Sequence, residues 1–283
     1  MTKDPEGTGV GWRPEIASVL AGTTGLGFCE VIAESLNPGD VPVPLRSLAA
    51  GGTTVIPHGV RLSLGGTEPV DAGRVTHLAA CAEALDAPLV SEHVSFVRAG
   101  GREAGHLLPL PRTREALDVL AANIARTRTE LDVPLAVEPI AALFDWPDDE
   151  FGEPEFLTRL LDRTGALLLL DVANIHANTL NRGQDARAVL DAMPLDRVAY
   201  CHVAGGAVHD GLYHDTHTDA LPGPVLDLLG HLVDRCPSVP PVMLERDGRY
   251  PPATELRAEL AAIAAVTGTP APTGDGHTAG LVG

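Results

Sequence analysis

The sequence predicts a single (β/α)8 barrel, the TIM-barrel member of the α/β class. The chain has 283 residues, a length that suits one such barrel. Short apolar, β-branched segments alternate along it with segments of helical periodicity, eight strand-then-helix units in all. An open doubly wound sheet is the alternative, and it often carries a glycine-rich turn after its first strand. Here the first expected strand runs into Gly-Trp-Arg-Pro at 11–14, which favours the barrel.

Apolar runs bounded by turn residues predict the eight strands. In chain order they are Gly9–Arg13, Gly27–Glu34, Thr53–Val60, Pro88–Phe96, Pro134–Ile140, Ala166–Ile175, Arg197–Gly205 and Pro241–Asp247. Apolar residues spaced three or four apart predict helices, most clearly at Asp71–Leu85, Thr113–Leu131, Glu153–Arg163, Pro224–Cys236 and Ala253–Val266. Prolines near helix starts and glycines near helix ends support these boundaries, namely Pro14, Pro154, Pro224 and Pro252, and Gly22, Gly51 and Gly165.

The two ends of the chain are small, polar and rich in Pro and Gly, a composition typical of disordered termini. We therefore expect one catalytic barrel domain at 9–266, with a disordered N-terminus at 1–8 and a disordered C-terminal tail at 267–283.

The charge balance excludes several function classes. The chain has 20 basic and 38 acidic residues and a formal net charge of −18, which disfavours binding to nucleic acid or to an anionic membrane surface. Four scattered cysteines form no metal or disulfide framework, and no apolar run is long enough for a signal peptide or a membrane span. These features predict a soluble protein of the reducing cytoplasm.

Polar side chains stand toward the carboxyl ends of six consecutive strand units, where barrel active sites are built. Buried parallel strands are otherwise almost wholly apolar, and clustered buried carboxylates repel one another unless cations lie among them. The pattern therefore predicts a metal site. Its nine candidate ligands are His58, His93, Glu138, Asp171, Asn174, His202, Asp215, His217 and Glu245.

Nine groups are too many for one ion, which takes roughly four to six ligands, and they suit two or three. Imidazoles mixed with carboxylates, without thiolates, favour Fe, Mn or Zn. Asp215 and His217 face the same way if the loop after the seventh strand is extended. Three nearby residues could support the ligands or the substrate without binding metal: Glu92, His176 and His214.

The motifs SEHVSF, VEP, LLDVANIHAN, CHVAG, D-x-H and LERDG, with PHGV upstream, resemble those of the multinuclear non-haem iron-dependent oxidative enzymes, a family with MbnB-like and TglH-like members. The resemblance covers about residues 9–266 in the right order. It implies a TIM barrel with two or three iron ions (Fe2+/Fe3+) and O2 as cosubstrate. It further implies oxidation of a residue, often Cys, in a ribosomally synthesised precursor peptide, commonly presented by a small partner protein.

Carried over residue by residue, the resemblance makes His58, His93 and Glu138 the ligands of one iron. It puts Asp171, His202 and Glu245 near another, with Asn174, Asp215 and His217 for a third. The sequence departs from the family at His176, where relatives tend to carry an aromatic residue such as Tyr.

Two other functions remain open. A metal-dependent hydrolase or isomerase of the xylose-isomerase or endonuclease IV type would also set His, Glu and Asp in a barrel. Such an isomerase uses an active-site lysine, however, and the only lysine here is Lys3, while such a nuclease needs a cationic groove. A non-catalytic peptide-binding scaffold would have no reason to keep nine clustered ligand-type groups.

Ligands from six strands leave little of the barrel mouth for reading a peptide sequence. Peptide selection is therefore expected from the loops at Arg98–Arg112 and Leu143–Glu153, or from a partner protein. Arg98 and Arg102 stand out in an acidic chain and could attract an acidic leader segment. The alternative is that this segment is an ordinary solvated surface loop.

Overall fold

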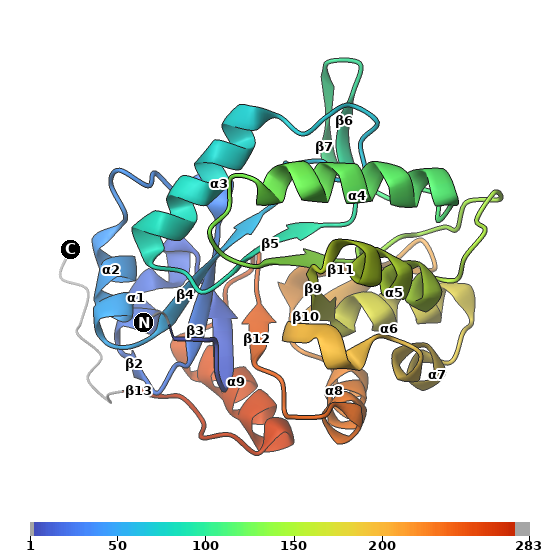
Figure 1. Cartoon of the computed structure of the whole chain (residues 1–283). Helices are drawn as coiled ribbons and strands as arrows, with labels where there is room; N and C mark the ends of the chain where they lie inside the picture. Colours follow the sequence, from blue (N-terminus) through green and yellow to red (C-terminus); the bar gives the residue numbers. More distant parts are fainter. Residues whose placement is uncertain (1–2, 275–283) are drawn as a thin grey trace.

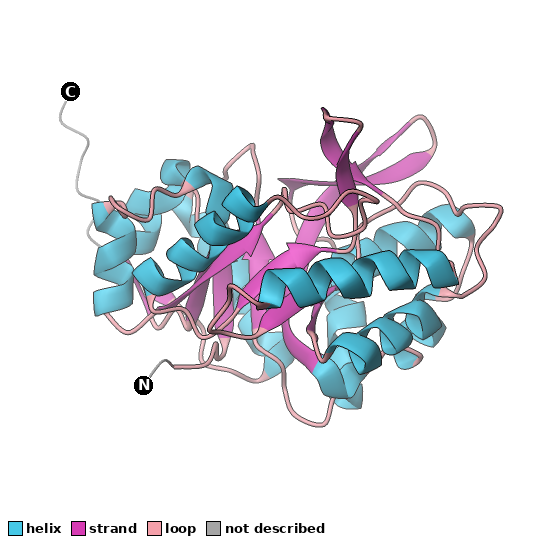
Figure 2. Cartoon of the chain, turned by 45° about the horizontal axis from the view of Figure 1, so that its top comes forward, coloured by secondary structure: helices cyan, strands magenta, loops and turns pink. Residues whose placement is uncertain are grey.

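Eight parallel strands close into a barrel with helices around it, which confirms the predicted fold (Figure 1). The computed structural model describes residues 3–274. Around the barrel the strands follow the order β1, β3, β4, β5, β8, β9, β10 and β12, and β12 pairs with β1 to complete the ring. Figure 2 shows the same barrel with its helices outside and two hairpins projecting from one end.

The barrel strands are β1 (Thr8–Gly11), β3 (Phe28–Ile32), β4 (Thr54–Gly59), β5 (Val90–His93), β8 (Leu135–Glu138), β9 (Leu167–Asp171), β10 (Val198–His209) and β12 (Val242–Glu245). The helices are α1 (Ala17–Ala21), α2 (Val43–Ala50), α3 (Ala72–Leu85), α4 (Arg114–Arg128), α5 (Glu153–Thr164), α6 (Val172–Arg182), α7 (Ala186–Asp191), α8 (Gly223–Arg235) and α9 (Ala253–Thr267).

Short strands outside the barrel complete the fold: β2 (Thr23–Thr24) with β13 (Thr273–Gly274), β6 (Phe96–Ala99) with β7 (Arg102–Leu108), and β11 (Leu212–Asp219) antiparallel to β10. The five helices named in the sequence are present within one to three residues of their expected ends. Gly22, Gly51 and Gly165 follow α1, α2 and α5 directly, as expected.

The barrel interior is built in two layers, because side chains two residues apart on a strand point to the same face. The lower layer is an apolar cluster of Phe28, Ile56, Leu89, Ala136, Leu169, Tyr200 and Met243. Two residues further along the same seven strands stand seven buried polar residues, Glu30, His58, Ser91, Glu138, Asp171, His202 and Glu245. We call this second set the polar layer.

The inward positions of β1 are the glycines Gly9 and Gly11, so this strand places no side chain in the barrel interior and leaves room for neighbouring side chains. A Cβ on Gly9 would lie 2.6 Å from the ring of Phe28, and one on Gly11 would lie 3.2 Å from the guanidinium of Arg13. The outward side chains of the strands, such as Val10, Leu135 and Leu170, join the larger core under the helices.

One expected strand was wrong in its second half. The predicted strand Ala166–Ile175 is β9 only as far as Asp171, and α6 begins at Val172. The Asp171 side chain accepts hydrogen bonds from the backbone N–H groups of Ala173 and Asn174, and this N-cap starts the helix directly at the strand end. Asn174 and His176 therefore lie on a helix.

Two segments expected as loops are hairpins. The Arg98–Arg112 segment is largely the β6–β7 hairpin, and Asp215 and His217 lie on β11 instead of in a loop. The ends also differ from expectation. Thr8 already belongs to β1, and Thr273–Gly274 pair with β2, whereas residues 1–2 and 275–283 of the expected disordered ends lie outside the described residues.

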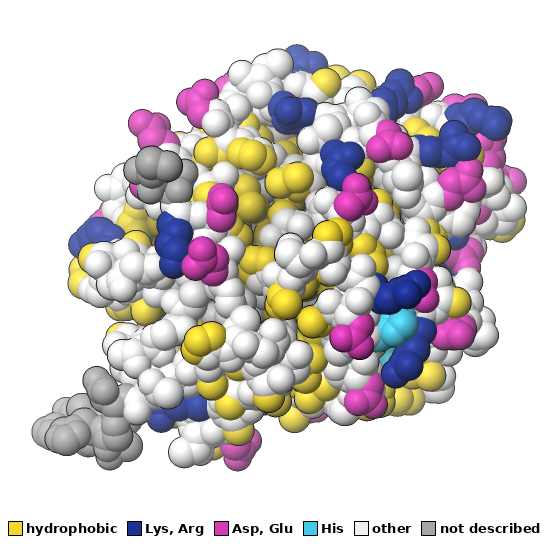
Figure 3. All heavy atoms as spheres, turned by 60° about the horizontal axis from the view of Figure 1, so that its bottom comes forward, with side chains coloured by type: hydrophobic (Ala, Val, Ile, Leu, Met, Phe, Trp, Pro, Cys, Tyr) yellow, Lys and Arg dark blue, Asp and Glu magenta, His cyan; other side chains and the backbone are white. Residues whose placement is uncertain are grey.

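The surface mixes charges of both signs. On the face in Figure 3, basic side chains lie beside acidic ones. Elsewhere in the described chain, exposed ion pairs include Arg163–Asp118 and Arg159–Glu155. Within residues 3–274, no helix is long and apolar enough to cross a membrane.

Gly205 lets β11 lie against β10, so it controls where Asp215 and His217 stand. A Cβ there would lie 2.2 Å from the carbonyl oxygen of Asp219 and 2.4 Å from that of Ala220. We expect Gly205→Ala to lower the free energy of unfolding by about 1–3 kcal/mol, the usual cost of overpacking. Thermal unfolding measures this. Gly223→Ala, at a site with open space around the Cβ, is the control. Equal melting temperatures for the two variants would contradict the close packing of the hairpin.

Candidate metal centre

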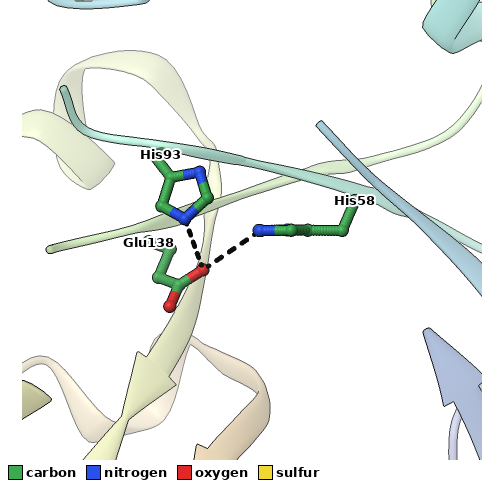
Figure 4. Close-up of side chains that lie close together, drawn as sticks. All are labelled: His58, His93 and Glu138. Atoms are coloured by element: carbon green, nitrogen blue, oxygen red, sulfur yellow. Dashed lines mark ion pairs between the residues drawn. The ribbon is translucent and has the colours of Figure 1, made fainter. Parts of the chain in front are cut away.

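Glu138 lies between two imidazoles at the carboxyl ends of three adjacent strands (Figure 4). Its Oε2 is 3.5 Å from Nε2 of His58 and 3.4 Å from Nε2 of His93. All three side chains are buried. The rings of His58 and His93 meet edge to face at 4.6 Å between centroids, so both Nε2 atoms point at the same carboxylate oxygen. We call these three residues the first triad.

The other oxygen of Glu138 faces a second group, around His202. Nδ1 of His202 is 3.5 Å from Oε1 of Glu138 and 3.2 Å from Oε2 of Glu245. Asp171 completes this group, with its ligand oxygen within 4.8 Å of those of Glu138 and His202. Glu138 thus stands between two ligand sets and offers one oxygen to each.

The β10–β11 hairpin brings a third group to the same place. Nε2 of His217 is 2.7 Å from Oδ2 of Asp215, and its Nδ1 is 3.0 Å from Oδ2 of Asp247 and 3.5 Å from Oε2 of Glu245. Asp215 and His217 also lie within ligand distance of Asp171. His217 adopts a positive φ of 55°, which non-glycine residues adopt rarely, and it lies where the register of the β10–β11 pairing shifts between His214 and Asp219.

Arg13 balances part of this negative charge. Its guanidinium Nη2 is 2.6 Å from Oδ1 of Asp247 and 3.3 Å from Oε1 of Glu245. The side chain is almost fully buried and occupies the space that Gly11 leaves inside the barrel. Arg13 therefore binds Oε1 of Glu245, while Oε2 of the same carboxylate faces His202.

The buried polar atoms suit bound metal. Five atoms of the centre have no hydrogen-bond partner anywhere in the described chain: Glu30 Oε1, Glu138 Oε2, Asp171 Oδ2, His202 Nδ1 and Asp215 Oδ1. An unpaired buried charge is costly, and these carboxylate oxygens and imidazole nitrogens are donors that Fe, Mn and Zn accept. Ten His, Asp and Glu residues in overlapping groups could hold more than one ion.

Mutual charge shifts the ionisation of this cluster. Burial favours neutral His93, yet Glu138, Glu92 and Glu245 raise its pKa to about 9. Burial raises the pKa of Asp171 to about 8, with help from the nearby carboxylates Asp215 and Glu138. Burial opposes the charge on Glu30, but His202 and His58 lower its pKa to about 2. The cluster therefore keeps protons on some ligand atoms when no metal balances the carboxylates.

A cavity of about 330 Å³ opens directly onto these ligands. His58, His93, Glu138, Asn174, Asp215, His217 and Glu245 line it, together with the apolar residues Ile32, Val60, Leu107 and Ile140. The side-chain amide of Asn174 donates to the carbonyl oxygen of Pro139 at 3.2 Å, which fixes its orientation at the cavity wall. All nine residues expected as ligands lie at this end of the barrel.

The expected supporting residues are less uniform. Glu92 points to the outer face of β5 and accepts from the backbone N–H groups of His93 and Leu62, so it anchors the strand end. His176 packs its ring on Tyr213 at 5.1 Å, and burial lowers its pKa. His214 packs on His209 across the hairpin at 5.7 Å, which turns it toward that residue rather than toward the carboxylates.

The arginines proposed for peptide recognition are mostly engaged. Arg98 pairs with Glu68 at 3.3 Å and donates to the carbonyl oxygen of Pro69. Arg112 pairs with Asp145 and Asp149, whereas Arg102 is exposed at the start of β7. The segment is thus not a free cationic patch.

Three residues of the centre were missed from the sequence: Glu30, Arg13 and Asp247. Glu30 is a charged residue in the middle of the apolar strand Phe28–Ile32, the same signal that identified the other ligands. Asp247 follows Glu245 by two residues, which is the spacing that placed Asp215 beside His217. Arg13 gave no such signal, because its role depends on the space over Gly11.

A family model described as "RiPP precursor modification enzyme MbnB/TglH/ChrH" matches residues 7–268. A UPF0276 protein of Streptomyces avermitilis is 52% identical over 264 residues, which is 91% of this chain but 54% of that protein. This chain therefore spans about half the length of that relative. A UPF0276 protein of Chromobacterium violaceum is 34% identical over 269 residues, covering 95% of this chain and 97% of that protein.

Among solved structures, a xylose isomerase domain protein from Planctomyces limnophilus superposes with a TM-score of 0.60 at 14% identity, covering 94% of this chain and 96% of that one. Endonuclease IV from Thermus thermophilus gives 0.56 at 16% identity, covering 92% and 98%. At these identities the likeness concerns the fold alone.

Metal binding should release protons, and the affinity should rise with pH. Ligands bind metal in their deprotonated form, whereas His93 and Asp171, with pKa values of about 9 and 8, hold protons at pH 7 without metal. We therefore expect affinity for Co2+, a redox-stable probe, to increase between pH 6 and pH 9. Calorimetry in buffers of different ionisation enthalpy counts the protons. Asp171→Asn should release about one proton fewer, and pH-independent affinity would rule out these protonated ligands.

Proposed function

We propose that this chain, which belongs to the MbnB/TglH/ChrH family of RiPP precursor modification enzymes, is an oxygen-dependent enzyme with two or three iron ions that oxidises a residue, in the first instance Cys, of a precursor peptide. The proposal that the centre binds metal rests on one observation. Buried ligand atoms of Glu138, Asp171, His202 and Asp215 have no hydrogen-bond partner within residues 3–274. Family membership supports the peptide substrate, and the mixture of imidazole and carboxylate suits iron.

The ligand groups divide between the ions as the geometry suggests. His58, His93 and Glu138 would hold one ion, and Asp171, His202 and Glu245 a second that shares Glu138. Asp215 and His217, with Asn174 at the cavity wall, would serve a third. When bound, iron supplies the one-electron redox chemistry that O2 requires and a positive centre for an anionic substrate group.

The protein's own contribution is positioning and exclusion of water. The polar layer rests on the packed apolar layer beneath it, so the ligands cannot relax toward solvent from below. Ile32, Val60, Leu107 and Ile140 give the cavity an apolar wall, which strengthens electrostatic interactions inside it. A peptide side chain entering the cavity would reach the ligand atoms that line it.

A metal-dependent hydrolase or isomerase is the second candidate, because a xylose isomerase domain protein and endonuclease IV share the fold on which this metal centre is built. Lys3 does not supply a lysine for sugar isomerisation. Its backbone oxygen accepts from Thr54 at the amino end of β4, and its ammonium pairs with Glu6, at the opposite end of the barrel from His58. A net charge of −18 disfavours a DNA substrate.

Peptide recognition would depend on the segments around the cavity or on a small presenting partner protein. Arg102 is the better placed of the two candidate arginines, because it is exposed on the projecting β6–β7 hairpin while Arg98 is paired with Glu68. The segment after β8 exposes Leu143, Phe144 and Trp146, which could add apolar contacts.

Protein prepared without oxygen should contain more than one iron per chain, and it should consume O2 when its peptide is present. Glu138→Gln removes the carboxylate that faces both ligand groups. It should reduce iron to below one per chain and lower O2 consumption more than about 100-fold. Elemental analysis and an oxygen electrode measure these quantities.

The exposed variant Glu83→Gln is the matched control and should behave as the wild-type protein. Full loading with zinc or manganese, with hydrolysis or isomerisation and no O2 uptake, would favour the second candidate. Normal iron content in Glu138→Gln would show that the centre lies elsewhere.

Charge reversal at Arg102 should weaken binding of an acidic leader peptide. The loss for Arg102→Glu should be several-fold at low ionic strength and small at high ionic strength, because exposed charges are screened by salt. Fluorescence anisotropy with a labelled peptide measures it. Arg187→Glu, the same change at an exposed position on α7, is the control. Equal affinities for the two variants would remove Arg102 from the recognition site and leave the segment after β8 or a partner protein.

A further inference from the structure

A continuous hydrogen-bonded path runs through the polar layer beneath the cavity and joins two imidazoles of the centre. Nδ1 of His58 is 2.7 Å from Oγ of Ser91, and this Oγ is 2.7 Å from the hydroxyl of Tyr200. The Tyr200 hydroxyl is 2.5 Å from Oε2 of Glu30, and the same oxygen is 3.0 Å from Nε2 of His202. Every residue of the path is buried.

The direction of each hydrogen bond follows from counting protons. The Glu30 carboxylate can only accept, so Tyr200 donates its single O–H proton to it. The Tyr200 oxygen is then the acceptor for the Ser91 hydroxyl. Ser91 has no second proton to give, so its oxygen must accept from Nδ1–H of His58. His58 is thereby fixed as the Nδ1–H tautomer, and its Nε2 lone pair points at the first triad.

The opposite tautomer follows at the other end of the path. Glu30 accepts from Nε2–H of His202, which leaves the lone pair of His202 on Nδ1. That Nδ1 faces Glu138 and Glu245, and it is one of the buried atoms without a hydrogen-bond partner within the described chain. The two imidazoles therefore offer different ring nitrogens to the same centre.

We propose that Glu30 is a positioning residue for both ligand groups. It fixes His202 directly and His58 through Tyr200 and Ser91, so that His58 binds metal through Nε2 and His202 binds metal through Nδ1. The inference rests on the proposed metal centre. It adds that Glu30, Tyr200 and Ser91 act on the centre without being ligands, a role that hydrogen-bonding partners of metal-bound histidines commonly have.

Glu30 as a direct ligand is the competing assignment, since Glu30, His202 and Glu245 also lie within ligand distance of one another. The two nitrogens of His202 separate the possibilities. An ion bound by Glu30 would use Nε2 of His202, whereas an ion bound beside Glu138 and Glu245 uses Nδ1. The Glu30 oxygen nearest His202, Oε2, already accepts two hydrogen bonds, which favours the positioning role. The other oxygen, Oε1, is buried without a hydrogen-bond partner within the described chain, so the test depends on which His202 nitrogen carries the proton.

The whole chain is loaded with Zn2+, a diamagnetic probe. 1H–15N NMR of the imidazoles then identifies which nitrogen of His58 and of His202 carries the proton. We expect Nδ1–H on His58 and Nε2–H on His202. Either ring with the other nitrogen protonated would overturn the proposal. If the wild-type protein takes up no Zn2+, the metal proposal fails instead, and the tautomer of neutral His58 in the metal-free protein still tests the path.

Variants then test the two parts of the path separately by Zn2+ competition with a chelator. Tyr200→Phe and Ser91→Ala interrupt only the part of the path between Glu30 and His58. Each should therefore lower the affinity of the first triad for Zn2+ by about 10- to 100-fold and leave the affinity of the His202 group unchanged. Glu30→Gln should weaken both. Tyr250→Phe, a tyrosine outside the path, is the matched control.

Ser91→Ala removes one oxygen atom from a small side chain, so it tests the part of the path to His58 even if Tyr200→Phe fails to fold. Wild-type affinity at the first triad in a folded Ser91→Ala variant would overturn the proposal. These readouts need neither O2 nor peptide. A protein with the expected tautomers that consumes no O2 would therefore contradict the proposed function and leave this inference standing.

Discussion

Six carboxylates and four imidazoles share the carboxyl end of this barrel, and each charge removed from water there needs a partner of opposite sign. Arg13 is the one arginine of the described chain within the group, and it meets only Glu245 and Asp247. The remaining carboxylates depend on imidazoles, on protons, or on cations from outside the chain. The excess of carboxylates therefore favours the binding of cations at the centre. The packed apolar layer beneath keeps the ligand side chains in place.

Much of the fold could be predicted from the sequence, because barrel strands are marked by apolar runs and their partners by helical spacing. The candidate ligands were also accessible, since a histidine or a carboxylate in such a run is conspicuous. The same rule covers Glu30, in the middle of Phe28–Ile32, but that residue lies deep in its strand rather than at its end. Its importance depends on Tyr200 and Ser91, which come from two distant strands.

Other differences arise where one local pattern permits two structures. Residues 166–175 are apolar enough for a long strand, and only the side-chain cap from Asp171 ends the strand and starts α6. The β10–β11 hairpin is polar on its outer half, so the sequence of β11 resembles a loop. Its pairing is decided by Gly205, where two backbones approach more closely than any side chain allows.

The two interior layers have a consequence for how such chains can vary in length. Each polar residue stands two positions after its apolar neighbour on seven strands, and side chains alternate faces with every residue. One inserted or deleted residue within a strand would turn its ligand outward under the helices and bring an aliphatic side chain into the centre. Insertions and deletions should therefore accumulate in the βα segments and hairpins. Homologues can then differ in the length of these segments while each barrel strand keeps the same number of residues.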